Sequence, residues 1–358
     1  MKKKVLISTG GSGGHVLPAV IVHDHLKSSH EIIISTDLRG LKFLEKENYN
    51  TIIINTPKLS NLYFLPISII KIFILTLKSY KILKKENISI LVSTGGYMSL
   101  PLCLAAKLLN IKIFLIEPNM VLGRANKFFL NFSKKIICYS KNLKNFPKKF
   151  DHKITLSKPL IRKKYYENIF NKKDNNLFTI LIIGGSQGAN IFDTLFSNTL
   201  VNIAKICSLK IIHQTNEENI DVLKQFYNKN NILSRVFTFD QNLINLMTES
   251  DLCITRGGAS SLAELSLINL PFIVIPLPNS KDNHQYENAL YYESKNACWI
   301  FDQNNFDEKK FEELLSVICR KNNEFIAKKI NLKKLNYQNT WNSVNQKLLE
   351  TFNEYFIR

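Results

Sequence analysis

Short runs of apolar, mostly β-branched residues alternate with longer amphipathic stretches along almost the whole chain. Such alternation is typical of parallel sheets built from βαβ units. In the first half, strands are predicted near residues 4–9, 31–36, 51–55, 89–94, 112–117, 135–140 and 153–157. The segment "KKDNNLFTILIIGG" then restarts the pattern, with strands predicted near residues 178–184, 209–214, 235–239, 251–255, 271–276 and 297–301.

The restart predicts an α/β protein of two Rossmann-like, doubly wound domains, and 358 residues are enough for both. The first domain is expected over residues 1–160 and the second over 161–337, with a polar linker region at 163–176. The tail, about 338–358, is helical in period and is expected to return to the first domain. Ligands of such sheets bind beyond the carboxyl ends of the strands.

One segment departs from this pattern. Residues 62–85, "LYFLPISIIKIFILTLKSYKILKK", are apolar for sixteen residues apart from Lys71 and then become basic. Pro66 interrupts the run, which is too short to cross a bilayer. Two interpretations stay open: a helix in the core of the first domain, or an interfacial helix whose apolar face enters lipid while its lysines meet anionic headgroups.

Glycine-rich junctions follow several predicted strands. "STGGSGGH" covers residues 8–15, "GGY" covers 95–97 and "GGSQG" covers 184–188. Such junctions expose backbone N–H groups at the positive end of a helix, which suits phosphate. Neither the dinucleotide spacing G-x-G-x-x-G nor the P-loop pattern is present. Asp37, after the second strand, could still act as a ribose-binding acid, which keeps a dehydrogenase as an alternative.

Other polar residues also follow strands. His15 stands at a helix start, which favours a neutral imidazole able to act as a general base. Glu264 is expected in the first turn of a helix, as a helix cap or as an acceptor for two ribose hydroxyls, with Ser260 and Ser261 as further capping candidates. Gln285 is expected at the start of a helix that begins near Asp282.

Composition adds two expectations. Six widely spaced cysteines and the lack of a signal-peptide pattern indicate a cytosolic chain with free thiols. The net charge of +19 either serves an anionic partner, such as a membrane surface, or reflects a composition rich in lysine. No nucleic-acid-binding module is found, so no nucleic acid is expected as a partner.

Taken together, the motifs resemble those of the MurG family of peptidoglycan glycosyltransferases in the GT-B superfamily. The resemblance covers the full length and rests on "GGSGGH" (10–15), "GGY" (95–97), "EPN" (117–119), "GGSQGA" (184–189), "GGASSLAE" (257–264) and "KDNHQYENA" (281–289), in family order. It implies an inverting transfer of N-acetylglucosamine (GlcNAc) from UDP-GlcNAc to the 4-hydroxyl of N-acetylmuramic acid in lipid I. The product would be lipid II for peptidoglycan synthesis, hence a part in cell-wall biogenesis, cell shape and cell division.

The resemblance also implies roles for individual residues. His15 matches the proposed general base of the family. Gly10, Gly11, Gly95, Gly96 and Tyr97 match its acceptor loops, in an acceptor and membrane-associated first domain. The residues that match its binding site for the UDP-GlcNAc donor are Ser12, Gly13, Gly14, Asn119, Arg162, Ser186, Ala259, Ser260, Ser261, Leu262, Ala263, Glu264 and Gln285.

The chain departs from the family pattern in places. "KPLIR" (158–162) shifts Arg162 by one residue from the family's Asn-Pro-Val-Arg, and "GGYMSLP" lacks the glycine that often follows the serine. Phe239–Asp240 align with the uracil-contacting stretch, where the family commonly has an apolar residue. No Asp-x-Asp pair occurs, so no metal site and no cofactor are expected, and helix N-termini would stabilise the departing UDP.

The resemblance places the chain on the cytoplasmic face of the inner membrane as a peripheral protein. Two alternatives stay open at this point. One is a UDP-GlcNAc 2-epimerase, which shares the fold but has no use for an apolar, basic segment. The other is a non-catalytic protein that binds a lipid diphosphate or another polyanion.

Overall fold

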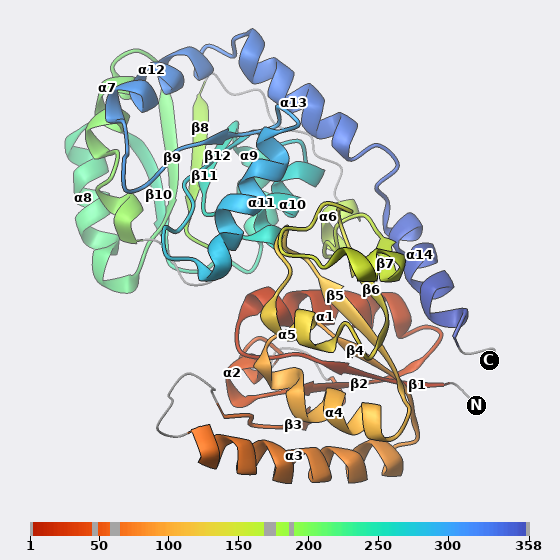
Figure 1. Ribbon diagram of the computed structural model, residues 1–358. Helices are drawn as coiled ribbons and strands as arrows, with labels where there is room; N and C mark the ends of the chain where they lie inside the picture. Colours follow the sequence, from red (N-terminus) through yellow and green to blue (C-terminus); the bar gives the residue numbers. More distant parts are fainter. Residues whose placement is uncertain (1–2, 45–48, 58–64, 168–176, 186–189, 356–358) are drawn as a thin grey trace. The chain divides into compact units, whose positions relative to one another are not determined.

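The computed structural model describes residues 3–44, 49–57, 65–167, 177–185 and 190–355. The chain forms two compact units, one of Met1–Lys163 with Asn339–Arg358 and one of Lys164–Gln338. Each unit is built on its own parallel sheet (Figure 1). The boundaries lie within three residues of those expected from the sequence, and the prediction of two doubly wound α/β domains is confirmed.

The sheet of the first unit has the strand order β3-β2-β1-β4-β5-β6-β7, and all neighbours are parallel. Both faces of its central strands are covered, which explains their continuous apolar sequences. The strands are β1 (Lys4–Ser8), β2 (Glu31–Thr36), β3 (Thr51–Ile53), β4 (Ile88–Ser93), β5 (Lys112–Glu117), β6 (Ser133–Cys138) and β7 (Ile154–Leu156). The α-helices in the described part of this unit are α1 (Gly13–Leu26), α2 (Leu38–Leu41), α3 (Leu65–Lys85), α4 (Leu100–Leu108), α5 (Arg124–Phe129) and α14 (Trp341–Asn353).

The sheet of the second unit has the order β10-β9-β8-β11-β12-β13, again all parallel. Its strands are β8 (Phe178–Ile183), β9 (Leu209–Gln214), β10 (Leu233–Phe237), β11 (Leu252–Thr255), β12 (Phe272–Val274) and β13 (Trp299–Ile300). Its helices include α6 (Lys164–Glu167), α7 (Ser197–Ala204), α8 (Ile220–Lys229), α9 (Leu243–Glu249), α10 (Ala259–Leu267), α11 (His284–Glu293), α12 (Glu308–Ile318) and α13 (Asn323–Leu335).

Every strand predicted from the sequence is present, each overlapping its predicted range. The strand order reverses between β1 and β4 in the first unit and between β8 and β11 in the second. At such a switch point the connections leave the sheet on opposite faces, so a crevice opens beyond the carboxyl ends of the two strands. The loops that follow β1, β4, β8 and β11 are the glycine-rich ones, which places them where a ligand of each unit would bind.

The C-terminal helix α14 belongs to the first unit. Its apolar stripe, Val344, Leu348 and Phe352, is buried in the same core as Val5 of β1. At its start the Trp341 ring stacks on the buried His25 ring of α1, with centroids 3.6 Å apart. The expected return of the tail to the first domain is therefore observed.

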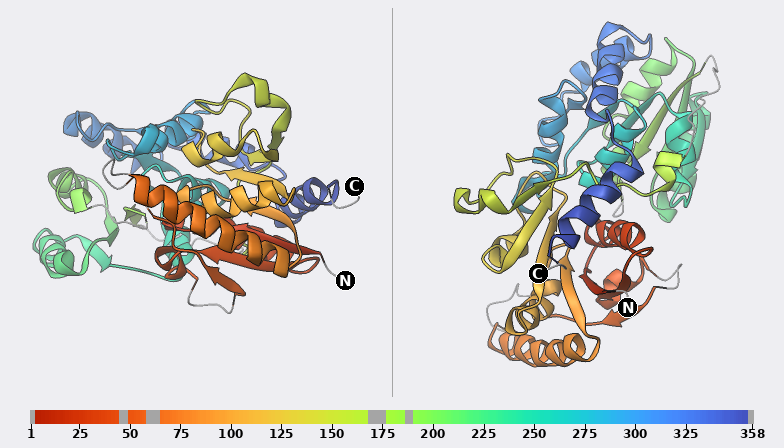
Figure 2. Two further views of the ribbon diagram at one scale, coloured as in Figure 1. Left: turned by 60° about the horizontal axis from the view of Figure 1, so that its bottom comes forward. Right: turned by 90° about the vertical axis from the view of Figure 1, so that its right-hand side faces the viewer.

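Helix α3 lies at the periphery of the first unit beside α4 (Figures 1 and 2). The face that packs on the unit includes small polar residues, Ser68, Thr76 and Ser79, together with Leu83. The opposite face is apolar and exposed, so the interpretation of α3 as a core helix is wrong for that face. Its exposed apolar side chains are Ile67, Ile69, Ile70, Phe73, Ile74 and Leu77.

Among the described residues, none of the helices combines the length and the hydropathy that crossing a bilayer requires.

Candidate active site

The ends of four neighbouring strands form the candidate site of the first unit. Gly10–His15 follow β1, Gly95–Tyr97 follow β4, Asp37 follows β2 and Glu117 ends β5. Since these strands are parallel, their carboxyl ends lie at one edge of the sheet. The structure brings the predicted acceptor loops and His15 together at this edge.

His15 is fixed by a contact between the two glycine loops. Its Nδ1 lies 2.9 Å from the carbonyl oxygen of Thr94, directly before Gly95. A carbonyl can only accept, so Nδ1 carries the hydrogen and the neutral ring keeps its lone pair on Nε2. Nε2 lies 3.5 Å from the position that a Cβ on Gly96 would take. Gly96 therefore leaves the basic nitrogen uncovered on that side, and its φ of +78° also favours glycine.

The first glycine loop passes close to Asp37. The carboxylate Oδ1 accepts the N–H of Gly11 at 2.8 Å, and a Cβ on Gly10 would lie 2.8 Å from the same oxygen. Asp37 thus holds the first glycine loop in place. Its carboxylate is engaged by the protein's own backbone and not by the ribose of a dinucleotide, as it would be in a dehydrogenase. Helix α1 begins next, with Ser12 as its N-cap residue and with no side-chain capping bond described for it.

Asn119 is held by Glu117 at the end of β5. A Glu117 carboxylate oxygen accepts the Asn119 side-chain amide at 3.1 Å, and the other accepts the Asn126 amide at 3.0 Å. The oxygen that accepts the Asn126 amide, Oε2, also accepts the backbone N–H of Gly123 at 2.8 Å. Asn126 in turn lies beside Gly95. The sequence places Glu117 beside Asn119 at the end of a strand, in the "EPN" motif, but the resemblance gave Glu117 no role of its own.

In the second unit, the loop after β8 is described only in part. Gly184 and Gly185 are described, and Gly184 donates its N–H to the Gln214 side chain at 3.2 Å. Gly185 has a φ of +77°, with open space where a Cβ would be. Ser186, predicted to contact the donor phosphates, lies outside the described residues.

Helix α10 follows β11 and carries six predicted donor-binding residues. Gly258 is its N-cap, so the alternative that Ser260 and Ser261 cap the helix is wrong. Glu264 lies in the second helical turn, not the first, so a capping role for it is also wrong. Its side chain is buried, whereas three of the others are half-buried. The predicted set consists of Ala259, Ser260, Ser261, Leu262, Ala263 and Glu264.

Gln285 is positioned by close packing. Its Oε1 accepts the N–H of Gly257 at 3.2 Å and that of Leu277 at 3.0 Å. A Cβ on Gly257 would overlap the backbone of Gln285, so only glycine lets α11 approach the end of β11 this closely. Helix α11 starts at His284, two residues later than expected, because Asp282 and Asn283 adopt left-handed backbone conformations.

Two buried groups of the second unit were not predicted as site residues. Arg256 donates to the carbonyl of Ile275 at 2.9 Å and stacks on the Phe192 ring, and burial lowers its pKa to about 10. Asp193 pairs with His213 at 3.3 Å. Burial alone would raise the Asp193 pKa, but the nearby His213 ring and hydrogen bonds donated by Thr215 and Asn219 hold it below its usual value. The sequence could have pointed to both residues, since Arg256 lies within "TRGG" (255–258) and Asp193 closely follows "GGSQGA" (184–189).

Two further predicted positions lie apart from these groups. Arg162 belongs to the first unit, between β7 and α6, where its side chain is half-buried. Phe239 is 69% exposed, and Asp240 accepts a hydrogen bond from Arg235 at 2.7 Å.

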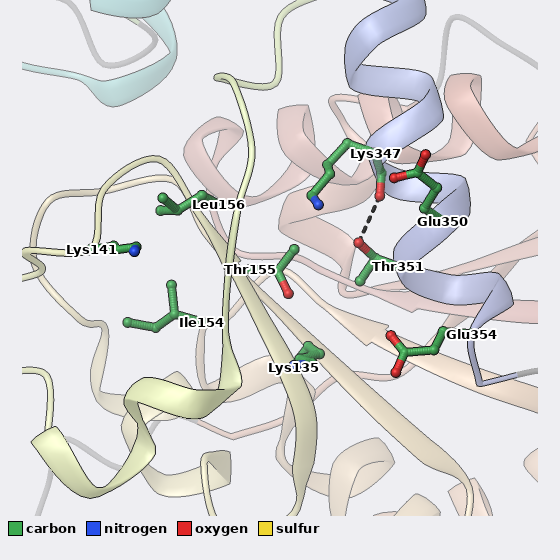
Figure 3. Close-up of a pocket in the computed structure, with 9 residues that line it drawn as sticks. All are labelled: Lys135, Lys141, Ile154, Thr155, Leu156, Lys347, Glu350, Thr351 and Glu354. Atoms are coloured by element: carbon green, nitrogen blue, oxygen red, sulfur yellow. Dashed lines mark hydrogen bonds between the residues drawn. The ribbon is translucent and has the colours of Figure 1, made fainter.

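A pocket of about 520 Å³ lies elsewhere in the first unit, between β6, β7 and α14. Figure 3 shows Lys347 and Glu350 of α14 on one side and Lys135 and Thr155 of the strands on the other. It is lined by residues of an edge strand, away from the β1–β4 switch point in the strand order, and contains none of the predicted site residues. We do not assign the candidate site to it.

Comparison with known proteins bears on this site. Residues 5–138 match the glycosyltransferase family 28 N-terminal domain and residues 179–341 match the C-terminal domain of that family. The chain is 48% identical over 355 residues, 99% of this chain and 100% of the relative, to the UDP-N-acetylglucosamine–N-acetylmuramyl-(pentapeptide) pyrophosphoryl-undecaprenol N-acetylglucosamine transferase of Pelagibacter ubique. The protein of the same name from Rickettsia canadensis is 36% identical, with coverage of 88% and 91%.

The chain belongs to glycosyltransferase family 28. The resemblance to the MurG family is thereby confirmed, and so is the prediction of an enzyme that transfers a glycosyl group. The dehydrogenase and the non-catalytic binding protein are wrong as alternatives. The crystal structure of Acinetobacter baumannii MurG has a TM-score of 0.76, at 22% identity and coverage of 97% and 98%, which supports the GT-B fold.

Proposed function

We propose that this family 28 enzyme transfers GlcNAc from UDP-GlcNAc to the 4-hydroxyl of N-acetylmuramic acid in lipid I, forming lipid II with inversion at the anomeric carbon. The relative that is 48% identical over its full length carries this donor and this lipid-linked acceptor in its name. The UDP-GlcNAc 2-epimerase alternative is disfavoured because the two family 28 models match residues 5–138 and 179–341, which include most strands of both sheets.

The observation that carries the proposal is the contact of 2.9 Å between His15 Nδ1 and the Thr94 carbonyl oxygen. With Nδ1–H donated to Thr94, Nε2 keeps its lone pair beside Gly96, at a loop assigned to the acceptor. His15 then takes the proton of the acceptor hydroxyl as that oxygen attacks C1 of the sugar and the bond from C1 to UDP breaks. A base of this kind supplies about 10²- to 10⁴-fold in rate.

The second unit is proposed to hold the donor. Glu264 accepts the two ribose hydroxyls, with the α10 residues 259–263 lining the nucleotide pocket, and Ser186 contacts the phosphates. Gln285, whose Oε1 is used by Gly257 and Leu277, directs its Nε2 group to a sugar hydroxyl. The resemblance to the family also offers Ser12, Gly13, Gly14, Asn119 and Arg162, all of the first unit, as donor contacts.

We further propose that transfer requires no metal ion or cofactor. The chain has no Asp-x-Asp pair of the kind that holds a divalent ion at a leaving diphosphate. Backbone N–H groups at helix starts, such as those of α1 after β1 and α10 after β11, supply positive partial charge where the charge of UDP develops.

The outer face of α3 is proposed to rest on an anionic membrane, on the cytoplasmic face of the inner membrane. Phe73, 63% exposed, is the most exposed of its apolar side chains. Apolar side chains at a helix surface enter the acyl boundary, while basic residues meet the headgroups. This would bring the acceptor loops to a substrate that carries a polyprenyl chain. The exposed lysines of the helix are Lys71, Lys78, Lys81, Lys84 and Lys85.

The test is transfer of labelled GlcNAc from UDP-GlcNAc to a lipid I analogue by the full chain, with and without EDTA, with the linkage of the product determined. We expect a β-1,4-linked product at the same rate in both conditions. Loss of transfer with EDTA would contradict the metal-free part alone. Binding of UDP-GlcNAc with epimerisation at C2, or without transfer, would overturn the proposed function.

A further inference from the structure

The segment Asp37–Gly40, between β2 and α2, makes contacts that no proposed role explains. The Asp37 side chain is only 5% exposed. Its Oδ1 accepts the N–H groups of Gly11 and Gly40 at 2.8 and 2.9 Å, and its Oδ2 accepts Nε of Arg39 at 2.8 Å. Burial would raise the pKa of Asp37, but these three donors outweigh it and hold the pKa below its usual value. The carboxylate is therefore charged, and both of its oxygens accept hydrogen bonds within the protein.

Arg39 continues this network to the second acceptor loop. Its Nη2 donates to the Tyr97 hydroxyl and lies 3.5 Å from the sulfur of Met98. The guanidinium carbon is 5.5 Å from the centre of the Tyr97 ring. The same Nη2 lies 3.9 Å from the position of a Cβ on Gly11. Arg39 thus connects the loop after β4 to the loop after β1, through Asp37.

The backbone leaves little room for these contacts to change. A Cβ on Gly40 would lie 2.9 Å from the Cα of Gly10 and would overlap Thr36. A Cβ on Gly10 would meet both Asp37 and, at 3.1 Å, Met98. Two glycines therefore let the Asp37 segment and the first glycine loop come into direct contact.

The Thr94 and Thr9 hydroxyls, directly before the two acceptor loops, share a hydrogen bond of 2.9 Å, and two further contacts join the loops themselves. On one side the His15 ring donates to Thr94. On the other, Gly11 is joined to Tyr97 through Asp37 and Arg39. His15 lies four residues after Gly11 along the chain, so the second connection restrains the loop from which helix α1 and the base begin.

We propose that Asp37 and Arg39 are positioning residues: they bridge the two acceptor loops and hold them at the separation at which Nε2 of His15 reaches the acceptor hydroxyl. This inference rests on the proposed function. The bridge needs a planar side chain that donates from Nε to a carboxylate and from Nη2 to a hydroxyl. Lysine has one charged nitrogen and cannot make both contacts in that geometry.

The kinetic test uses Arg39→Met, Tyr97→Phe and the double variant, with Lys42→Met as control. Lys42 is an exposed cation three residues along the same segment. A small displacement of a base lowers kcat, so we expect Arg39→Met to lose about tenfold in kcat, with the KM for UDP-GlcNAc within about twofold. The double variant should match Arg39→Met within about twofold, because both changes break one bridge. Lys42→Met should resemble the parent.

Three results would overturn the inference. Unchanged kcat in Arg39→Met is one. A higher KM for the acceptor at unchanged kcat is another, because it would make Arg39 a substrate contact. Losses that multiply in the double variant are the third. Arg39→Lys gives a second variant that keeps the charge, and recovery of full kcat by it would also contradict a bridge.

A readout without activity separates this inference from the proposed function. In the parent chain the Gly11 N–H is donated to a buried carboxylate, so hydrogen exchange at Gly11 should be slow. Arg39→Met should speed exchange in residues 95–99, and Asp37→Asn should speed it in both loops. If the parent transfers no GlcNAc, the proposed function fails while the exchange data still test the bridge. Exchange unchanged in both variants would overturn the bridge even if transfer occurs.

Discussion

The two units carry the same strand–glycine–helix pattern at their switch points, yet they use polar side chains differently. In the first unit, His15 is half-buried with Nδ1 on the Thr94 carbonyl and Nε2 beside Gly96, and Asp37 and Glu117 connect the surrounding loops. In the second, Arg256 and the Asp193–His213 pair are buried behind the loops.

The difference follows from what each unit is proposed to do. Proton transfer needs a basic atom that a substrate can reach, held by its neighbours in one tautomer. Binding a nucleotide needs backbone N–H groups and a few acceptors fixed in place, which close packing such as that of Gly257 on Gln285 provides. Changes at His15 and at the contacts that hold its loop should therefore lower kcat, and changes at the donor-binding residues of the second unit should weaken donor binding.

The largest expected effect is that of His15→Ala. We expect kcat to fall by about 10³-fold, because the general base is lost, while the Kd for UDP-GlcNAc stays within about twofold. The matched control is His23→Ala, two turns further along α1, where the ring contacts Asp24 and Tyr49. Steady-state kinetics with titration calorimetry measures both quantities. Equal losses in kcat and in donor affinity would remove the assignment of His15 as base.

The sequence predicted the fold well because the strands are buried on both faces and appear as continuous apolar runs between glycine loops. It predicted the positions of His15 and Gln285 because each follows a strand or opens a helix. It could not predict the Arg39–Tyr97 contact, which joins residues 58 apart in the chain. It also placed Glu264 one helical turn too early, since the cap is Gly258, a residue without a side chain.

The next largest expected effect is on stability, which should depend on acid pH differently in the two units. Burial lowers the pKa of His25 to about 4, whereas an unfolded histidine titrates near 6.5. Between these values the unfolded chain binds a proton that the first unit does not. Stability is therefore full above about pH 6.5 and falls by about 3 kcal/mol as the pH drops to 4. In the second unit Asp193, with its pKa held below 3.8, loses its contribution only at still lower pH.

The two tryptophans report the units separately, since Trp341 lies in the first and Trp299 in the second. Single-tryptophan variants followed by fluorescence during urea unfolding at pH 7 and pH 4.5 should show the first unit weakening more. His25→Phe keeps an aromatic ring against Trp341 and should remove most of this pH dependence. If the first unit of His25→Phe loses as much stability between pH 7 and pH 4.5 as the parent does, groups other than His25 cause the acid sensitivity.

Glu264→Ala should have a smaller effect, confined to the donor. Losing a charged acceptor for two ribose hydroxyls costs about 2 kcal/mol, which corresponds to about 30-fold in the Kd for UDP-GlcNAc. We expect kcat at saturating donor to change little. Glu264→Gln keeps the shape and should lose less. The same Kd for all three chains, measured by calorimetry, would rule out the ribose contact.

The smallest expected effect concerns the exposed apolar face of α3, which belongs to the first unit. Removing one phenyl group from an apolar contact costs about 1.5 kcal/mol, so Phe73→Ser should weaken binding to vesicles with anionic lipid about tenfold. Val222 of α8 is equally exposed, at 65%, but belongs to the second unit, so Val222→Ser should leave vesicle binding unchanged. Transfer to a water-soluble acceptor should be the same in all three chains. Vesicle binding that is insensitive to Phe73→Ser would contradict the membrane-facing role of α3.

Salt distinguishes the apolar from the basic contribution of α3 to vesicle binding, because ions screen charge and leave apolar burial largely intact. The loss caused by Phe73→Ser should therefore be similar at low and high salt. Replacing Lys78, Lys81, Lys84 and Lys85 by glutamine should weaken binding at low salt only. If the lysine variant binds vesicles like the parent at low salt, the basic half of α3 contributes nothing there, and the net charge of +19 is then better explained by composition than by a membrane partner.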